Sequence, residues 1–260
     1  MPSADNHLRY FEHFHPYFPI VRTRDPDTCY KAGPILFWVV IVTACRRYAR
    51  DDTVFPFLVE ALQSEIWASV AVPPLSLPTV NALLLLCAWP LTGVRFLTDP
   101  SNIYSSVAMN ACFVLGLHTG QGGHPEHTYP AYRLAVTDEE AVYTWSGYNI
   151  ISQRVCSYSG FPPTGQFFNR AIEAVLDHTC PIQVPVHFTI LLETARFLNK
   201  VSRTMSAVLE GAKGVSHHII SLLEDDFDRI QRVISQDISG KLNLRVDDLL
   251  HDRANKVRPI

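Results

Sequence analysis

An apolar stretch that a proline ends places the strongest limit on how this 260-residue chain can fold. Within residues 75–91, apolar side chains recur at the spacing of one helix face. They are Val80, Leu83, Leu84, Cys87 and Ala88. Pro78 suits the first turn of a helix capped by Leu77 or Ser76, and Pro90 pushes the residue before it out of the helical region. A helix this apolar needs partners on several sides, so the chain must build a buried helical core.

A second apolar helix follows within residues 99–118. Asp99-Pro100 predicts its N-terminus, and Gly116 can supply the left-handed residue that ends it. We expect its apolar stripe to consist of Ile103, Val107, Ala111, Val114 and Leu115. Small residues such as Ala108 and Ala111 would let a neighbouring helix approach closely.

Helical patterning continues along the rest of the chain. We predict a short helix over residues 8–14 that breaks at Pro16 into an extended segment, and a buried helix from Pro34. Thr137 and Glu140 form a capping box at the start of a helix over 138–157. Further helices are predicted over 166–177, 186–209 and 216–239, and a surface loop over 119–131. Convincing strand alternation is missing, so the predicted fold is all-α, an irregular multi-helix domain.

Charge and hydropathy exclude two classes of protein. The net charge is −3, whereas a stand-alone DNA-binding domain is usually basic. The basic groupings are small and predict only solvated surface: Arg46, Arg47 and Arg50, then Arg253, Lys256 and Arg258. The longest apolar runs, 34–45 and 82–90, are shorter than the roughly 20 residues of a membrane-spanning helix, so we expect no membrane partner.

The six cysteines are scattered along the chain. They are Cys29, Cys45, Cys87, Cys112, Cys156 and Cys180. A C-x-x-C pair is missing, so neighbouring cysteines cannot assemble a local zinc site. Cys87 and Cys112 lie within apolar helical patterns and are predicted to be small buried hydrophobes. Scattered free cysteines and the lack of a signal peptide indicate a reducing compartment.

Histidine groups raise a metal hypothesis that their spacing does not support. The groups are His7 with His13 and His15, His124 with His127, and His217 with His218. None matches the HExxH motif or a two-histidine, one-carboxylate set. On a helix, residues i and i+2 also point away from each other. We therefore predict no metal site and no cofactor in this chain.

An acidic string at residues 224–228 raises an enzymatic alternative. Glu224, Asp225, Asp226 and Asp228 resemble the magnesium-binding carboxylates of terpene synthases, where acids three residues apart hold metal ions that bind diphosphate. The second metal motif of that family does not follow downstream. Arg229 and Arg232 can pair with the acids, which favours a salt-bridged helix surface.

Short catalytic signatures are also missing. The chain has no G-x-S-x-G, P-loop or dinucleotide-binding motif and no catalytic Cys-His signature. The loop over 157–165 has glycines and prolines but no lysine and few free N–H groups, so it cannot cradle a phosphate. We expect no enzyme and no catalytic residue.

Four segments in order together resemble the regulatory middle-homology domain of fungal zinc-cluster transcription factors. They are YFEHFHPYFPI at 10–20, PILFWVVIVTACRR at 34–47, LLLLCAWPL with SSVAMNACFVLGLH at 83–118, and EEAVYTWSGYNIISQRVCSYSGFPP at 139–163. The alanine-rich helix ending in Leu-Gly-Leu-His and the later helix with a central tryptophan are similar to the most recognisable parts of that family. The resemblance spans residues 8–163.

The chain departs from the family in three respects. Arginines usually precede the central tryptophan, but Ala141, Val142 and Tyr143 stand before Trp145. A basic residue usually follows Leu-Gly-Leu-His, but here Thr119 follows. The six-cysteine DNA-binding module, which would hold the zinc, is missing from this sequence.

The resemblance implies a function. It implies the regulatory domain of a nuclear RNA polymerase II transcription regulator that controls a metabolic gene set and reaches DNA only through the missing module. We expect residues 1–240 to form this domain and residues 241–260 to form a charged, flexible tail. Partners would be related factors, as homo- or heterodimers, and a small-molecule effector, for which Arg154 and His118 near aromatic segments are candidates. Two alternatives stay open: the terpene-synthase-like enzyme, and an interaction protein that inhibits related factors without a DNA-binding module.

Overall fold

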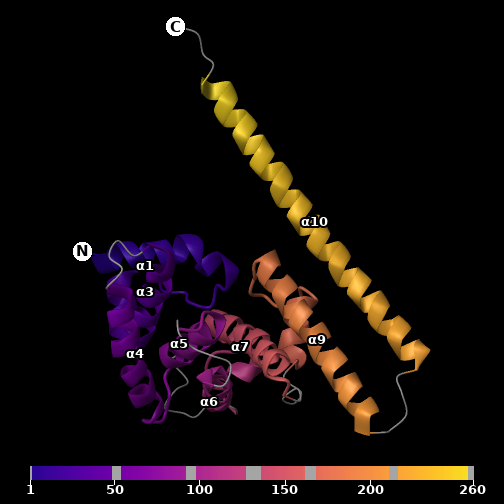
Figure 1. Cartoon of the computed structure of the whole chain (residues 1–260), viewed down its shortest axis with the longest axis horizontal. Helices are drawn as coiled ribbons and strands as arrows, with labels where there is room; N and C mark the ends of the chain where they lie inside the picture. The colour runs from indigo at the N-terminus through magenta and orange to yellow at the C-terminus, as the bar shows by residue number, and fades with distance from the viewer. Residues whose placement is uncertain are drawn as a thin grey trace. The chain divides into compact units, whose positions relative to one another are not determined.

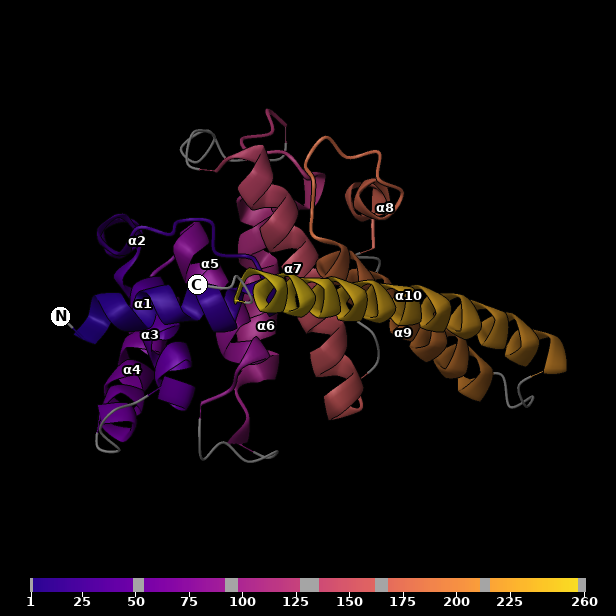
Figure 2. The same cartoon turned by 90° about the horizontal axis from the view of Figure 1, so that it is seen from above.

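The computed structural model describes residues 2–48, 54–91, 98–126, 136–161, 168–210 and 216–256, and all regular structure in these ranges is helical. The all-α prediction is therefore confirmed. The chain divides into two compact units, Met1–Val184 and Pro185–Ile260. Figures 1 and 2 show the helices of the first unit, α1 to α8, and the two long helices of the second, α9 and α10.

The first unit opens with α1, Pro2–His13, and a single 3-10 turn at His15–Tyr17. The chain then runs without helix to Asp25. The helix ends near Phe14 as predicted, but it begins earlier than expected, and Pro16 lies inside the 3-10 turn, so the extended segment starts only after Tyr17. Two helices were not predicted: α2, Pro26–Ala32, and α4, Val54–Val70. The Asp25 side chain caps α2 by accepting a hydrogen bond from the Thr28 amide at 2.8 Å.

Helices α3, Pro34–Tyr48, and α5, Leu77–Ala88, run through the apolar centre of the first unit. The predicted cap is confirmed, because the Ser76 hydroxyl accepts from the Thr79 amide at 3.3 Å. Helix α5 stops before Trp89 as Pro90 requires. Arg46 on α3 donates to the Trp89 carbonyl at 2.7 Å and also to the Pro90 carbonyl, so a guanidinium satisfies acceptors that the end of α5 leaves open.

Helix α6, Ser101–Val114, corrects the predicted apolar stripe. Ile103 is 48% exposed, and Val107 and Val114 are only half-buried. The buried face instead consists of Ser101, Tyr104, Ser105, Ala108, Ala111 and Cys112. Small side chains are buried here because α6 packs against both α5 and α7, which leaves little room for branched residues. Gly116 takes the left-handed conformation with φ of 72°, as predicted.

Helix α7, Asp138–Ser159, begins with the predicted capping box: the Thr137 hydroxyl accepts from the Glu140 amide at 3.2 Å, and Glu140 accepts from the Thr137 amide at 2.9 Å. A Cβ on Gly147 would lie 2.6 Å from Ile20 Cγ2, so glycine lets the extended segment after the 3-10 turn pack directly on α7. Helix α8, Arg170–Leu176, begins later than the predicted residue 166, with Asn169 as its cap.

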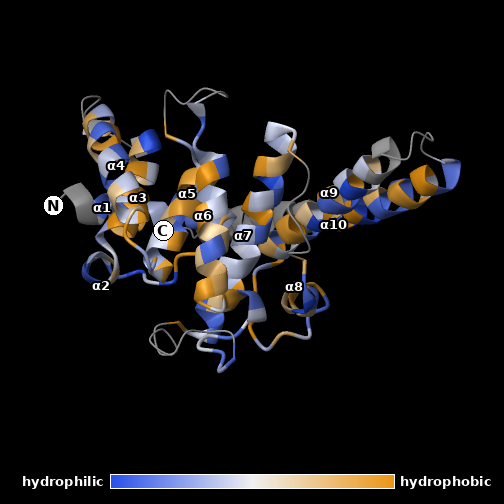
Figure 3. Ribbon diagram, turned by 90° about the horizontal axis from the view of Figure 1, so that it is seen from below, coloured by the Kyte–Doolittle hydropathy of each residue, from blue (hydrophilic) through white to orange (hydrophobic). Residues whose placement is uncertain are grey.

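The second unit pairs α9, Val186–Glu210, with α10, His217–Lys256. Glu193 on α9 accepts from Arg196 at 3.1 Å and from Arg229 on α10 at 2.7 Å, and Phe197 lies against Phe227. Helix α10 continues beyond the predicted residue 239, because Gly240 costs about 1 kcal/mol relative to alanine but does not break a helix. Figure 3 shows hydrophobic and hydrophilic residues alternating along α9 and α10, whereas α5 is mostly hydrophobic.

In the described part of the chain, no helix combines the length and the apolar character needed to span a membrane.

Candidate functional site

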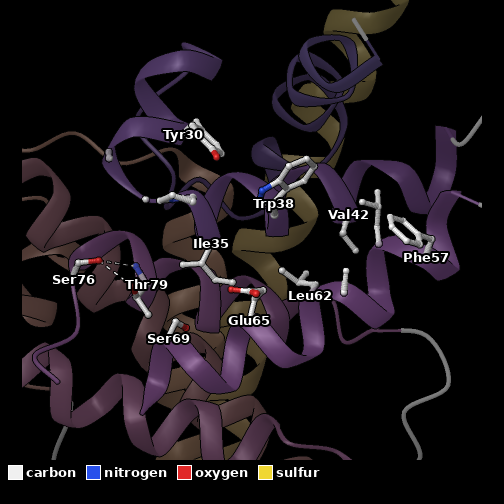
Figure 4. A pocket seen from close by; sticks show the side chains of 15 residues that line it. Tyr30, Ile35, Trp38, Val42, Phe57, Leu62, Glu65, Ser69, Ser76 and Thr79 are labelled. Atoms are coloured by element: carbon white, nitrogen blue, oxygen red, sulfur yellow. Dashed lines mark hydrogen bonds between the residues drawn. The ribbon is translucent and has the colours of Figure 1, made fainter. Parts of the chain in front are cut away.

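A cavity of about 740 Å³ opens between α3 and α4 in the first unit. Figure 4 shows the side chains around it. They come from α2, α3, α4 and the start of α5: Tyr30, Ala32, Gly33, Pro34, Ile35, Trp38, Val42, Phe57, Leu58, Ala61, Leu62, Glu65, Ser69, Ser76 and Thr79. Its volume falls within the range of roughly 300–1,000 Å³ that is usual for small-molecule sites.

The apolar side chains that line this cavity follow the spacing of one helix face on both α3 and α4. On α3, Ile35, Trp38 and Val42 follow the i, i+3, i+7 spacing of one face. Across from them, Leu58 and Leu62 lie four residues apart on α4. The walls are therefore hydrophobic along most of their length.

Three aromatic rings in the lining keep access to solvent. Tyr30 is 47% exposed, Trp38 is 38% exposed and Phe57 is 69% exposed. Large aromatic side chains left this open in a helical domain usually mark a place where something binds. We therefore take the α3–α4 cavity as the candidate ligand site.

Polar groups gather at one end of the cavity, where α4 approaches the start of α5. Ser69 donates its hydroxyl to the Ile66 carbonyl at 2.8 Å. The hydroxyls of Ser76 and Thr79 lie 3.0 Å apart and share a hydrogen bond. Glu65 lies one turn before Ser69 and is the one charged side chain among the described residues that line the cavity.

Gly33, at the junction of α2 and α3, allows the floor of the cavity to form. A Cβ at this position would lie only 2.4 Å from Pro78 Cβ in the first turn of α5. The φ of Gly33, −168°, is ordinary extended backbone that any residue can adopt. Glycine is therefore required here because a larger side chain has no space.

A second polar junction joins two of the four segments that carry the sequence resemblance. Trp145 on α7 is 1% exposed, and its indole N–H donates to Asn169 Oδ1 at 3.2 Å. Asn169 Nδ2 in turn donates to the carbonyl of His118 at 2.6 Å. The same side chain caps α8 by accepting from the Ile172 amide at 3.4 Å. Asn169 thus ties the Leu-Gly-Leu-His turn, the central tryptophan and α8 together, a role that the sequence did not reveal.

The structure does not bring the two predicted effector residues together. The His118 ring lies against Phe113 and Trp145, near the start of α7. Arg154 lies nine residues after Trp145 on the same helix, about 13 Å further along its axis, and donates to the Ala88 carbonyl at 3.1 Å. Neither residue lines the α3–α4 cavity. The role of these two residues in ligand binding stays a prediction.

Two histidines of the predicted groups, His7 and His15, lie against the same ring, that of Phe11. His7 is fully buried between Phe11 and Phe37, and the His15 ring pairs with the Val21 carbonyl at 2.9 Å. Of the other histidines in the predicted groups, His13 lies beside Glu12, His124 lies in a turn, and His217 and His218 lie on the exposed start of α10. His127 lies outside the described residues. No set of three or more histidine, cysteine or acidic side chains that could hold a metal ion occurs in the described ranges.

One carboxylate of the acidic string on α10, that of Asp226, is engaged in ion pairs. Asp226 lies 2.6 Å from Lys200 on α9 and 3.9 Å from Arg229. Arg232 donates to the backbone carbonyl of Asp228 at 3.2 Å. These contacts fit the predicted salt-bridged surface, since such pairs hold carboxylates in place between two helices.

Cys87 and Cys112 behave as buried hydrophobes, as predicted. Cys87 is 3% exposed and Cys112 is fully buried, and both thiols are free. Burial raises the pKa of Cys87 to about 12 and of Cys29 to about 11. The pKa of Cys112 is raised for the same reason. Such thiols are poor nucleophiles at neutral pH.

The two basic groups belong to different units of the chain. Arg46 is bound to the end of α5, as described above, and Arg47 is exposed. Arg253 and Lys256 belong to α10. Arg50 and Arg258 lie outside the described residues.

Comparisons with known proteins agree on one family. The family model described as the fungal specific transcription factor domain matches residues 8–143. The putative transcription factor SEF1 of Eremothecium gossypii is 30% identical over 217 residues, which are 82% of this chain and 20% of that protein. SEF1 of Kluyveromyces lactis is 32% identical over 63% of this chain and 15% of its own length. The regulatory protein LEU3 of Saccharomyces cerevisiae is 26% identical over 78% of this chain and 24% of its own length.

The chain spans about a quarter or less of the length of these curated relatives. No solved structure matches it. The matched residues 8–143 contain the whole α3–α4 cavity and extend into α7 just short of Trp145. The family that matches is one of transcription factors, so the comparisons do not support the terpene-synthase alternative. This chain belongs to the family of the fungal specific transcription factor domain.

Proposed function

We propose that this domain is the effector-responsive part of a nuclear RNA polymerase II transcription regulator that controls a metabolic gene set. The observation that carries the proposal is the position of the α3–α4 cavity inside the segment that matches the family model. A regulatory domain responds to a metabolite only if it has a binding site and if binding changes the relative free energies of its conformations. The cavity is a site of suitable size in a domain of the right family.

In this proposal, residues 1–240 form the regulatory domain and residues 241–260 form a charged tail. DNA contacts and zinc belong to a six-cysteine module on the same or an associated polypeptide. Arg154 and His118 enter the proposal as a second candidate effector site, apart from the cavity.

A reporter experiment tests the effector role. The full 260-residue chain is fused to an unrelated DNA-binding module and placed over a reporter gene in yeast grown on different nitrogen, carbon and metal sources. We expect reporter output to change by severalfold between media. Constant output in all media, with the fusion protein present at equal levels, would contradict the proposal.

Matched variants connect this response to the cavity. Ala61 and Ala68 are both exposed on α4, but only Ala61 lines the cavity. Ala61→Leu places a larger side chain in the lining, whereas Ala68→Leu adds the same atoms elsewhere on the helix. We expect Ala61→Leu to reduce the response and Ala68→Leu to preserve it.

A second function, self-association, is favoured by the surface of α10. Leu222 is 48% exposed, Phe227 is 53% exposed and Val233 is 40% exposed. Large apolar residues repeated along a 40-residue helix suit pairing with a second helix. We propose that the second unit forms homo- or heterodimers with related factors. Sedimentation equilibrium should give a dimer for the native chain and a monomer for the Leu222→Lys, Val233→Lys variant.

A further inference from the structure

We propose that the α3–α4 cavity selects a hydrophobic organic cation, with its ammonium group at Glu65 and its apolar body between Trp38 and Leu62. The inference specifies the ligand class of the proposed effector site, and its importance for transcription rests on that proposed function. Binding itself can be measured without any regulatory readout.

The charge in the cavity gives the first argument. Glu65 is the one charged side chain among the described lining residues. Figure 4 shows it reaching from α4 into the space between Ile35 and Leu62, on the side toward Trp38. A carboxylate in an otherwise uncharged, largely apolar lining attracts a cation and repels an anion. Charge complementarity therefore favours a positively charged ligand over a neutral or acidic one.

The hydrogen-bonding capacity of the polar end gives the second argument. Ser69 uses its proton on the Ile66 carbonyl, so its oxygen is left as an acceptor. Ser76 and Thr79 share a hydrogen bond, and Ser76 also accepts from the Thr79 amide. A carboxylate accepts only, so the polar end consists mainly of acceptors. A ligand that satisfies it must bring donors, which an ammonium group does and a carboxylate does not.

The aromatic lining gives the third argument. Tyr30, Trp38 and Phe57 surround the cavity and are each partly open to solvent. A ring face attracts a cation within about 6 Å of its centre, and tryptophan does so most strongly. The same rings provide apolar surface for the rest of the ligand. Aromatic rings together with one carboxylate are the combination that recognises amines with a hydrophobic body.

The size of the cavity gives the fourth argument. A volume of about 740 Å³ suits a ring system with a short aliphatic chain. A helical peptide would bring several polar backbone ends and side chains, but only one end of this cavity has polar partners for them. We therefore favour a small amine over a basic amphipathic helix.

Three probes of nearly equal shape test the inference: 4-phenylbutylamine, 4-phenylbutanol and 4-phenylbutyrate. Saturation-transfer NMR titrations use the full 260-residue chain at neutral pH and low salt. We expect the amine to bind about three- to fivefold more tightly than the alcohol, the size of effect that a partly exposed charge pair gives. The butyrate should bind most weakly. The Trp38 indole resonance should shift on titration with the amine and be missing in Trp38→Phe.

Variants of two glutamates on the same helix separate charge recognition from folding. Glu65→Gln should remove the preference for the amine while leaving the affinity for the alcohol unchanged. Glu60→Gln is the matched control, because Glu60 is exposed on α4 but does not line the cavity, and it should keep the preference. Added salt should reduce the preference in the native chain.

Several outcomes would overturn the inference. These are equal affinities for the three probes, strongest binding of the butyrate, no saturable binding of any probe up to millimolar concentration, or saturable binding of a basic amphipathic peptide alone. If the amine binds as expected and the reporter does not respond to any medium, the ligand class stands and the regulatory proposal fails. If the reporter responds and the amine does not bind, the regulatory proposal stands and the proposed ligand class is wrong.

Discussion

Two tryptophans in the first unit lie in opposite surroundings, and the contrast explains where this domain is rigid and where it can bind. Trp145 is 1% exposed on α7, stacks on Tyr148 at 5.2 Å and gives its N–H to Asn169. Trp38 is 38% exposed on α3 and lines the α3–α4 cavity. Both belong to apolar helices, so hydrophobicity alone does not separate them.

The two tryptophans differ in exposure because the helices around them pack differently. Helix α6 presents small residues such as Ala108 and Cys112 to its neighbours, so it packs closely against α5 and α7. Between α3 and α4, large aromatic side chains and leucines line a space that they do not fill. Close packing of small residues gives rigidity, and incompletely filled space between large residues gives a site.

Removing the side chain of each tryptophan in turn should produce the largest difference in the free energy of unfolding. Trp145→Ala loses buried ring contacts and should lower the free energy of unfolding by about 3–5 kcal/mol. Trp38→Ala should cost less than about 1 kcal/mol, because its ring is partly exposed beside a cavity. Urea unfolding followed by circular dichroism measures both. Similar losses in the two variants would show that the cavity is filled in solution.

Enlarging a side chain in each of the two regions should show the same difference in stability, but with smaller changes in the free energy of unfolding. Ala108 is fully buried between α6 and its neighbours, so Ala108→Leu should lower the free energy of unfolding by about 1–3 kcal/mol through overpacking. Ala61→Leu should change it by less than about 0.5 kcal/mol, because the added atoms enter open space. Thermal melts of the two variants at equal concentration provide the measurement. A marked loss in Ala61→Leu would argue against the cavity.

Local signals in the sequence predicted most helix ends of the first unit. Pro90 and Gly116 each end a helix where expected, and the Thr137 capping box begins α7. These features act over four residues or fewer, so sequence spacing contains them completely. The stripe on α6 was wrong because burial there depends on two neighbouring helices, and helix periodicity alone cannot choose among faces that all contain apolar residues.

A single polar side chain, Asn169, also contributes to the rigidity of the region around Trp145, and its effect on stability can be tested. Asn169→Ala removes the cap of α8 and leaves the Trp145 N–H without its acceptor, so we expect a loss of about 1–2 kcal/mol in the free energy of unfolding. Asn169→Ser can still cap the helix but is too short to bridge to the carbonyl of His118. It should recover part of the loss, as urea unfolding would show. Full recovery would mean that capping alone matters.

The cavity and the Asn169 junction could not be derived from the sequence because each joins residues far apart along the chain. Asn169 bonds to residues 24 and 51 positions away. The cavity depends on α4, which sequence patterns did not identify although Leu62 and Ile66 are fully or nearly fully buried in it. The histidines form no metal-holding set among the described residues, and Asp226 of the acidic string is ion-paired with Lys200 and Arg229.

The smallest predicted effect concerns His7, which lies behind the cavity wall against Phe37. It is fully buried, neither ring nitrogen has a hydrogen-bond partner among the described residues, and burial lowers its pKa while Asp25 opposes the shift. A histidine with a lowered pKa binds its proton more readily in the unfolded chain, so stability should fall as pH drops below the ordinary value of about 6.5 and stay level above it. His7→Leu should flatten this fall between pH 7.5 and 5.5 in urea unfolding, while His13→Gln, at an exposed histidine on the same helix, should leave it unchanged. An equal fall in the native chain and in His7→Leu would assign the acid sensitivity to other groups and show that the helices behind the cavity wall tolerate a charge.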